Sequence, residues 1–266
     1  METIKSFFNK YQLPIFFLLT YLLSWWSAPL QNGQIIPHGP MLAAVIVLAL
    51  SAGRPGLGVW WRRITHWRVA WYWYLVGPAM VVFYQGSAYI INQMLGASVT
   101  NPLHIPSTGI ILELLLLGGL WEEPGWTGYA LPKLQERFDN RPNGWLLAAL
   151  VLGVFRAIWH LPLFFYGHIP WFDVVVFEIA VQLIIAWLYN RSGGSVLVVI
   201  LYHFASNILS AVFSPTFTGE AFTVFYALFV GLACLVALGL YILLGKSGQR
   251  NRKDREPFGV SKNFEG

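Results

Sequence analysis

The sequence predicts an all-α protein, a polytopic membrane helix bundle of about eight transmembrane helices with both termini in the cytoplasm. Three observations lead to this prediction. Of the 266 residues, 56% are apolar and 11% are charged, which is about half the charged fraction of an ordinary soluble domain. The apolar residues form blocks of roughly 17 to 25 residues, the length of a membrane-spanning helix. The basic residues lie almost entirely between alternate blocks.

The candidate spans are apolar blocks separated by polar segments. They cover residues 13–28, 35–52, 70–91, 109–128, 145–165, 171–189, 196–213 and 222–245. Pro37, His38 and Pro40 interrupt the start of the second block, which is cleanly apolar only from Met41. The first block resembles a signal peptide, but it ends in a poor cleavage site and more spans follow, so we expect it to be retained.

The basic residues predict the orientation of these spans. With both termini inside the cell, 16 of the 17 Lys and Arg residues lie at the inner face and none lies in the outer loops. This is the distribution expected from the positive-inside rule, here for a multi-pass protein of the plasma (inner) membrane. The seventeenth basic residue, Arg156, lies inside the fifth span.

The chain divides into a membrane-embedded domain, residues 1–245, and a basic, disordered cytoplasmic tail, residues 246–266. Residues 60–74 interleave tryptophan with arginine beside a span, which is typical of an interfacial belt rather than of a nucleic-acid surface. We therefore expect anionic lipids at the basic inner loops and tail, and no nucleic-acid partner. The single cysteine, Cys234, excludes a disulfide framework and a cysteine-based zinc site.

Ionisable and strongly polar residues inside the spans are the candidate functional residues. An ionisable group at the bilayer centre costs at least a few kcal/mol, so each one suggests a function. They are Glu113, Glu122, Glu123, Arg156, His160, Glu178, His203 and Asn207. No motif surrounds Glu113 or Glu178, and for both we expect a role in the bundle or in a cavity.

Spacing suggests which of these side chains act together. His203 and Asn207 lie one helical turn apart on the same face, where they either bind one group or form an interhelical hydrogen-bonded pair. Glu122 and Glu123 point about 100° apart around a helix, so at most one of them meets a substrate. His160 comes two residues before Pro162, so its helix is expected to end or kink there.

Two chemistries fit this set of acids and histidines. The side chains could polarise a water molecule and stabilise an oxyanion. Glu122, His160 and His203 could alternatively hold zinc with an open position for water. A zincin is excluded, because the sequence contains no His-Glu-x-x-His motif.

The order of the motifs resembles a known family. Glu122-Glu123-Pro-Gly-Trp-Thr-Gly-Tyr-Ala-Leu-Pro132, then Trp159-His160-Leu-Pro162, then His203-Phe-Ala-Ser-Asn207 are similar to the motifs of the CAAX protease and bacteriocin-processing family, also called CPBP or Abi. That family carries Glu-Glu-x-x-x-Arg, Phe-x-x-x-His and His-x-x-x-Asn or Asp on separate spans. The resemblance covers about residues 109–213, and the eight-span plan agrees with it.

The resemblance implies an intramembrane endopeptidase that acts on a membrane protein or hydrophobic, possibly prenylated, peptide. Glu122 and His160 would activate water, His203 and Asn207 would stabilise the tetrahedral oxyanion, and Glu123 would support them. The family is widely labelled metalloprotease, yet its structures look more like a glutamate-dependent enzyme without bound metal. Whether the cofactor is a divalent metal such as zinc or none at all therefore stays open, and we favour metal-independent chemistry.

This chain departs from the family pattern at two positions. Thr127 stands where the first motif has Arg, and Arg156 stands where the second has Phe. Arg156 is one helical turn from His160, so it could supply the missing cation from the fifth helix. We expect it to form an ion pair with Glu123, and otherwise to face a wet cavity.

Two other functions fit the same residues. A proton-coupled carrier would use Glu122, Glu123 and His160 as a relay, and a catalytically inactive scaffold would bind a hydrophobic peptide.

The predicted depths of Glu122 and His160 in the membrane do not agree. In straight spans, the two residues would differ in depth by about 10 Å. A helix must therefore tilt or break, and Pro124, Gly125 and Pro162 are the expected positions.

Overall fold

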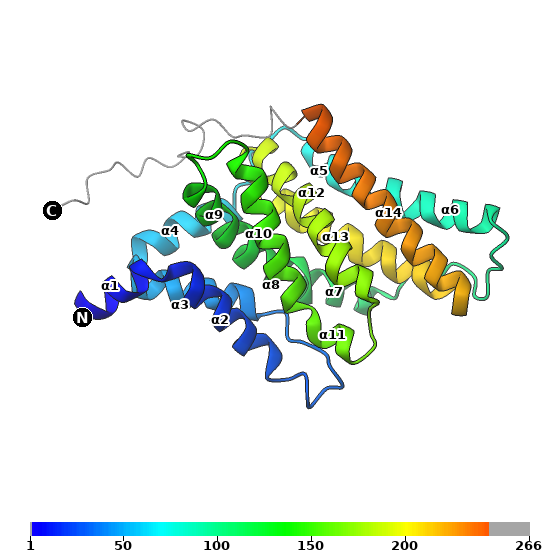
Figure 1. Cartoon of the computed structure of the whole chain (residues 1–266), viewed down its shortest axis with the longest axis horizontal. Coiled ribbons are helices and arrows are strands. Elements are labelled where there is room, and N and C mark those ends of the chain that lie inside the picture. Colours follow the sequence, from blue (N-terminus) through cyan, green and yellow to red (C-terminus); the bar gives the residue numbers. More distant parts are fainter. Residues whose placement is uncertain (1, 245–266) are drawn as a thin grey trace.

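The computed structural model describes residues 2–244, and these fold into helices and connecting loops without a β-strand (Figure 1). The predicted tail, residues 246–266, lies outside the described residues. The α-helices are α1 (Glu2–Lys10), α2 (Gln12–Trp25), α3 (Gly39–Ser51), α4 (Gly53–Ile64), α5 (Trp73–Val81), α6 (Ser87–Met94), α7 (Thr108–Leu117), α8 (Gly119–Gly125), α9 (Leu131–Arg137), α10 (Gly144–Trp159), α11 (Leu161–Phe165), α12 (Glu178–Arg191), α13 (Val196–Phe213) and α14 (Gly219–Leu244).

Four short turns interrupt or extend these helices. Three are π-helical, η1 (Val82–Gly86), η2 (Trp126–Ala130) and η3 (Asp173–Phe177), and η4 (Ser214–Thr216) is a 3₁₀ turn. A π turn widens the helix by one residue and changes the direction of the side chains that precede it. Glu123 lies three residues before η2, and Glu178 directly follows η3. Both turns therefore help to set where these side chains point.

Every predicted apolar block is helical, which confirms the all-α fold. Four continuous helices are long and apolar enough to cross a membrane: Trp73–Met94, Asp173–Arg191, Val196–Thr216 and Gly219–Ile242. Three shorter apolar helices, Gln12–Trp25, Gly39–Ser51 and Gly144–Trp159, match the first, second and fifth blocks. The fourth block is divided between α7, α8 and η2. The count of eight spans stays a prediction.

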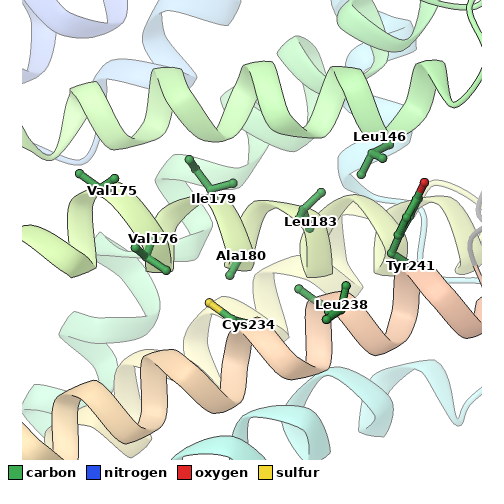
Figure 2. A pocket seen from close by; sticks show the side chains of 10 residues that line it. Leu146, Val175, Val176, Ile179, Ala180, Leu183, Cys234, Leu238 and Tyr241 are labelled. Atoms are coloured by element: carbon green, nitrogen blue, oxygen red, sulfur yellow. The ribbon is translucent and has the colours of Figure 1, made fainter.

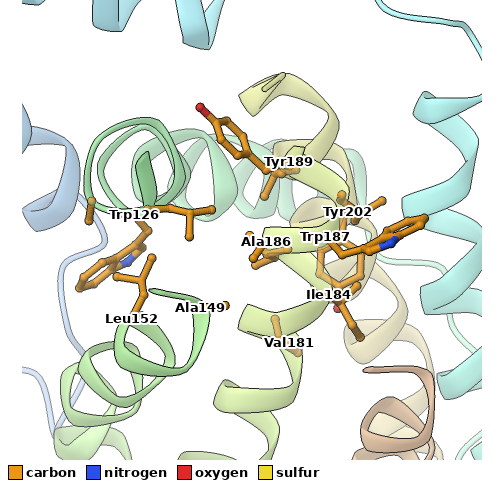
Figure 3. Packing of buried hydrophobic residues seen from close by; sticks show 14 of the residues in the cluster. Trp126, Ala149, Leu152, Val181, Ile184, Ala186, Trp187, Tyr189 and Tyr202 are labelled. Carbon is orange, nitrogen blue, oxygen red and sulfur yellow. The ribbon is translucent and has the colours of Figure 1, made fainter. Parts of the chain in front are cut away.

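Helix α12 lies at the centre of the bundle. It packs against α10, α13 and α14. Of the most apolar stretch of the continuous helix Asp173–Arg191, 72% is buried inside the protein, against 28% for Gly219–Ile242. Figure 3 shows Val181 and Ala186 of α12 between Ala149 of α10 on one side and Tyr202 of α13 on the other. Because α12 is apolar on most of its surface and lies inside the bundle, its few polar side chains must find partners there.

Hydrogen bonds between loops join segments that the predicted topology places at the same membrane face. Asn101 Nδ2 donates to the Pro215 carbonyl at 2.8 Å, and His168 Nε2 lies 2.6 Å from the Asn32 carbonyl, both between predicted outer loops. Ser195 Oγ donates to the His66 carbonyl at 2.6 Å between predicted inner loops. These contacts agree with alternating spans, while the orientation relative to the cell stays a prediction.

The break in the fourth block occurs at Gly118, not at Pro124 or Gly125 as predicted. Helix α7 ends at Leu117, and Gly118 has φ −98° and ψ −118°, outside the helical region. A Cβ at Gly118 would lie 2.6 Å from Asn207 Nδ2 and 2.8 Å from the Leu114 carbonyl, so only glycine fits. The predicted break near Pro162 is confirmed, because α10 ends at Trp159 and α11 begins at Leu161.

Candidate active site

Arg156 lies among three carboxylates inside the bundle. Its Nη1 is 2.8 Å from Glu123 Oε1, its Nη2 is 3.8 Å from Glu122 Oε2, and its Nε is 3.5 Å from Glu178 Oε2. The guanidinium also lies over the ring of Trp126, with 5.9 Å between Cζ and the ring centroid. The Arg156 side chain is 3% exposed, so these acids compensate a charge that water does not reach.

Glu123 is fully buried, and donors surround its carboxylate. Besides Arg156, His203 Nδ1 lies 2.8 Å from Glu123 Oε1, and Thr127 Oγ1 donates to Oε2 at 2.5 Å. The ion pair expected between Arg156 and Glu123 is therefore present. With its oxygens taken by protein donors, Glu123 is suited to hold other side chains in place.

Glu122 lies in a different environment from its neighbour. Its Oε1 is 3.9 Å from His203 Nε2, and within residues 2–244 its Oε2 has no hydrogen-bond partner although it is buried. A carboxylate oxygen buried without a donor is unfavourable unless a water or a substrate group binds it. Of the two adjacent acids, Glu122 therefore has the oxygen available for chemistry, in line with the expectation that at most one of them meets a substrate.

Local packing explains how α8 carries both acids to Arg156. A Cβ at Gly125 would lie 2.3 Å from the backbone of Pro40, so α8 and the start of α3 approach as closely as glycine allows. Trp60 Nε1 donates to the Pro124 carbonyl at 2.8 Å, which ties α4 to the same turn. Both contacts fix the short helix between Gly118 and η2, because a seven-residue helix has little stability of its own.

The two histidines each have a carboxylate beside Nδ1. His203 Nδ1 faces Glu123, while His160 Nδ1 lies 3.0 Å from the Arg156 carbonyl and 3.4 Å from Glu178 Oε1. In the part of the chain that the structure describes, His160 forms its ion pair with Glu178 and none with Glu122. The candidate residues thus come together from α8, α10, α12 and α13.

Asn207 lies beside the helix break. Its Nδ2 is close to Gly118, since a Cβ there would be 2.6 Å away, and His203 packs against the neighbouring Gly119, where a Cβ would be 3.0 Å from His203 Cβ. The pair predicted from their spacing therefore shares one face of α13 and points towards the start of α8. An amide N–H is one of the donors that can stabilise an oxyanion.

Glu178 is the site residue that sequence reasoning assigned elsewhere. It was expected to have a bundle or cavity role, yet it contacts both Arg156 and His160. The charge of Arg156 could have indicated this contact, because a buried arginine is expected to pair with the acids that are buried in the same bundle. Glu113, by contrast, is exposed on α7 and stays outside this cluster.

A bound metal ion needs several ligating side chains directed at one point. Among residues 2–244, no group of three or more His, Cys, Asp or Glu side chains is arranged to hold one. In the predicted set, Glu122 Oε1 lies 3.9 Å from His203 Nε2, whereas His160 forms its ion pair with Glu178. No step of the reaction below is therefore assigned to a metal.

Comparisons with known proteins agree with the motifs. Residues 104–209 match the family model described as Type II CAAX prenyl endopeptidase Rce1-like. The motif-bearing region is thus similar to CAAX proteases. A segment of 109 residues is 30% identical to CAAX prenyl protease 2 of Methanococcus maripaludis and covers 37% of this chain and 38% of that protein. No solved structure matches the chain significantly.

The CAAX protease match includes every residue of the cluster. Glu122, Glu123, Arg156, Glu178, His203 and Asn207 lie within residues 104–209, as do Thr127 and His160. An apolar groove of about 330 Å³ lies nearby between α10, α12 and α14, lined by Leu146, Ile179, Cys234 and Tyr241 among others (Figure 2). Its lining has no acid or histidine, so the groove itself has no catalytic groups.

Proposed function

We propose that this protein is an intramembrane endopeptidase in which Glu122 activates water. The observation that carries the proposal is the contrast between the two adjacent acids. Glu123 is held by Arg156, His203 and Thr127, whereas Glu122 Oε2 is buried without a hydrogen-bond partner among the described residues. A water molecule bound there would be close to a base that the surrounding protein already holds in place.

The proposed reaction uses the groups around Glu122. A water molecule that donates hydrogen bonds to Glu122 and to His160 Nε2 loses a proton to Glu122 as its oxygen attacks the peptide carbonyl carbon, and the carbonyl becomes a tetrahedral oxyanion. Asn207 Nδ2 and His203 Nε2 donate to this oxyanion, and His203 does so when both its ring nitrogens carry protons, because Nδ1 donates to Glu123. The proton on Glu122 then passes to the leaving amine as the peptide bond breaks.

The proposed substrate is the C-terminal region of a membrane-associated protein or a hydrophobic peptide. The support comes from the family model and from the name of the Methanococcus maripaludis relative. The match covers 38% of that relative's length, so prenylation of the substrate is proposed for this chain.

We also propose that the chain crosses the plasma (inner) membrane eight times, with both termini in the cytoplasm. The distribution of the basic residues supports this topology.

The test is cleavage of membrane-tethered peptides by purified protein in lipid vesicles, with products identified by mass spectrometry. We expect Glu122→Gln to abolish cleavage, because the amide keeps the side-chain size but cannot accept a proton from water. Glu113→Gln is the matched control, since it makes the same change at an exposed position of the preceding helix. Full activity of Glu122→Gln would contradict the proposal.

Adding a chelator to the same assay tests the metal-free reaction. Unchanged cleavage after complete removal of divalent ions is expected, because no group of side chains among residues 2–244 is arranged to hold a metal ion. Loss of activity that zinc restores would favour the metal alternative. Uptake of protons or solutes by the vesicles that Glu122→Gln abolishes, without cleavage of any peptide, would instead favour the carrier.

A further inference from the structure

We propose that Glu178 is a positioning residue that orients His160 with its proton on Nδ1, leaving Nε2 directed to the water and substrate. This inference rests on the proposed function and assigns a role to a residue outside the motifs. It rests on three observations: the contacts of His160 Nδ1, the donors around the Glu178 carboxylate, and the turn that places Glu178 at the start of α12.

The first observation concerns the nitrogen that carries the proton. His160 Nδ1 faces two acceptors, the Arg156 carbonyl at 3.0 Å and Glu178 Oε1 at 3.4 Å. Neither can donate a hydrogen when Glu178 is ionised, so Nδ1 must carry the proton. The Arg156 carbonyl also accepts the His160 backbone N–H at 3.2 Å, so it is shared. Glu178 is therefore the charged acceptor that favours this tautomer.

The second observation is that each carboxylate oxygen of Glu178 faces a different donor. Oε1 faces His160 Nδ1, and Oε2 lies 3.5 Å from Arg156 Nε. Both neighbours are donors, and a glutamine at this position would have one acceptor oxygen for two donors. The side chain is 9% exposed, so water does not readily replace the missing acceptor. The charge and shape of a carboxylate are thus needed together.

The third observation is the helical turn before Glu178. The Glu178 N–H donates to the Asp173 carbonyl five residues back, which closes the π turn η3. Tyr226 Oη donates to Asp173 Oδ2 at 2.5 Å, so the turn is anchored to α14. Regular α12 therefore starts at Glu178 itself, and its side chain is fixed by the turn behind it and by Arg156 in front.

The arrangement repeats one already present in the site. Glu123 accepts from His203 Nδ1 while bound to Arg156, and Glu178 faces His160 Nδ1 while bound to the same guanidinium. A carboxylate that fixes the tautomer and the ring orientation of a histidine acts through that histidine rather than on the substrate. Arg156 then links two carboxylate–histidine pairs.

The direct test is ¹⁵N NMR of histidine-labelled protein in lipid bilayers, with His160 assigned from the signal lost in His160→Gln. We expect the wild-type ring in the Nδ1–H form, a mixture of tautomers in Glu178→Leu, and a smaller change in Glu178→Gln. Glu178→Asp keeps two acceptor oxygens and should restore much of the wild-type spectrum. Glu113→Gln is the matched control and should leave the His160 signals unchanged.

The kinetic test follows turnover and KM for a cleaved peptide in the same variants. Loss of a carboxylate that orients a metal-bound histidine costs roughly 10–100-fold in affinity or activity. We expect kcat to fall by a similar factor in Glu178→Leu, with KM little changed. Glu178→Asp should recover part of this loss. If Glu178→Leu does not fold, the Gln and Asp variants make the same comparison.

Three outcomes separate this inference from the proposed function. An unchanged His160 spectrum in folded Glu178→Leu overturns the positioning role, and so does a changed spectrum with normal kcat. An active Glu122→Gln variant contradicts the proposed function instead, while the NMR comparison still decides what Glu178 does to His160.

Discussion

The two carboxylate–histidine pairs of the site differ in how tightly they are built. In the pair formed by Glu123 and His203, the carboxylate is 0% exposed and lies 2.8 Å from both His203 Nδ1 and Arg156 Nη1. In the pair formed by Glu178 and His160, the corresponding distances are 3.4 Å and 3.5 Å, and the Glu178 side chain is 9% exposed. The same three kinds of group thus make one closed pair and one more open pair.

The difference indicates separate roles for the two pairs. Glu123 has every oxygen engaged, so its pair is preorganised and can hold donors for an oxyanion without further movement. The pair of Glu178 and His160 has spare bonding capacity, because Glu178 Oε2 and Arg156 Nε lack hydrogen bonds among residues 2–244. The open pair is where we expect water and substrate to enter and the geometry to tighten on binding.

Replacing Arg156, the residue common to both pairs, should have the largest effect. Arg156→Phe leaves three carboxylates without their cation, and breaking a buried pair costs about 3–5 kcal/mol. We expect loss of cleavage and a lower unfolding temperature in lipid, measured by peptide assay and by thermal unfolding. Arg137→Phe, an exposed arginine on α9, is the control for the loss of a surface cation.

The double variant Arg156→Phe with Thr127→Arg sharpens this result. Thr127 already donates to Glu123 Oε2, so an arginine at position 127, as in the family motif, should reach the same carboxylate from η2. We expect the double variant to recover part of the kcat/KM that Arg156→Phe loses, because Glu123 in the closed pair regains a cation. A double variant that is folded and no more active than Arg156→Phe would show that Arg156 does not replace the family arginine.

Glu123→Gln tests the closed pair alone. The amide has one acceptor oxygen where Arg156, His203 and Thr127 all donate, so at least one donor loses its partner. We expect kcat to fall roughly 100-fold, the upper end for an orienting carboxylate, and further than in Glu178→Gln. Turnover measured side by side decides the order, and the opposite order would contradict the distinction between the pairs.

Gly118→Ala should have an intermediate effect through Asn207. The added Cβ would approach Asn207 Nδ2 to 2.6 Å, so the amide must move away from its place beside the start of α8. We expect roughly tenfold lower kcat, less than the roughly 10²–10³-fold lost when an oxyanion donor is removed outright, because the amide is displaced and not deleted, with little change in KM. Gly231→Ala in α14, where a Cβ meets nothing within 4 Å, should leave cleavage unchanged.

Thr127→Val should have the smallest effect on turnover. The substitution keeps the shape of the side chain and removes a single hydrogen bond to a Glu123 oxygen that is still next to Arg156. A hydrogen bond to a charged group contributes about 1.5–3 kcal/mol, so we expect lower thermal stability and a loss of turnover of only a few-fold. A complete loss of cleavage would mean that Thr127 takes part in the reaction itself.

Much of this site could be predicted from the sequence because membrane helices make buried charges conspicuous. The helical blocks, the shared face of His203 and Asn207, and the ion pair of Arg156 with Glu123 follow from periodicity and from the cost of burying charge. The positions of Thr127 and Arg156 were informative for the same reason. The arginine missing at position 127 leaves a buried acid without a cation, and Arg156 supplies one.

The details that could not be predicted depend on backbone geometry. The break at Gly118 requires a tertiary contact with Asn207 that no local pattern reveals, and the helix passes Pro124 and Gly125 without ending because η2 follows them. Glu178 was assigned to the bundle because the direction of its side chain depends on η3, and a π turn leaves no signal in apolar periodicity.

The contact between Arg156 and Glu178 also bears on how the chain enters the membrane during synthesis. These residues belong to α10 and α12, which are consecutive apolar helices packed against each other. An arginine opposes insertion by at most about 2.5–3.5 kcal/mol, the cost at the centre of a helix. Arg156 lies in the last turn of α10, and a partner on the next helix can lower its cost as the two leave the translocon together. The hairpin of residues 144–191 can therefore be charge-compensated before residues 196–244 are made.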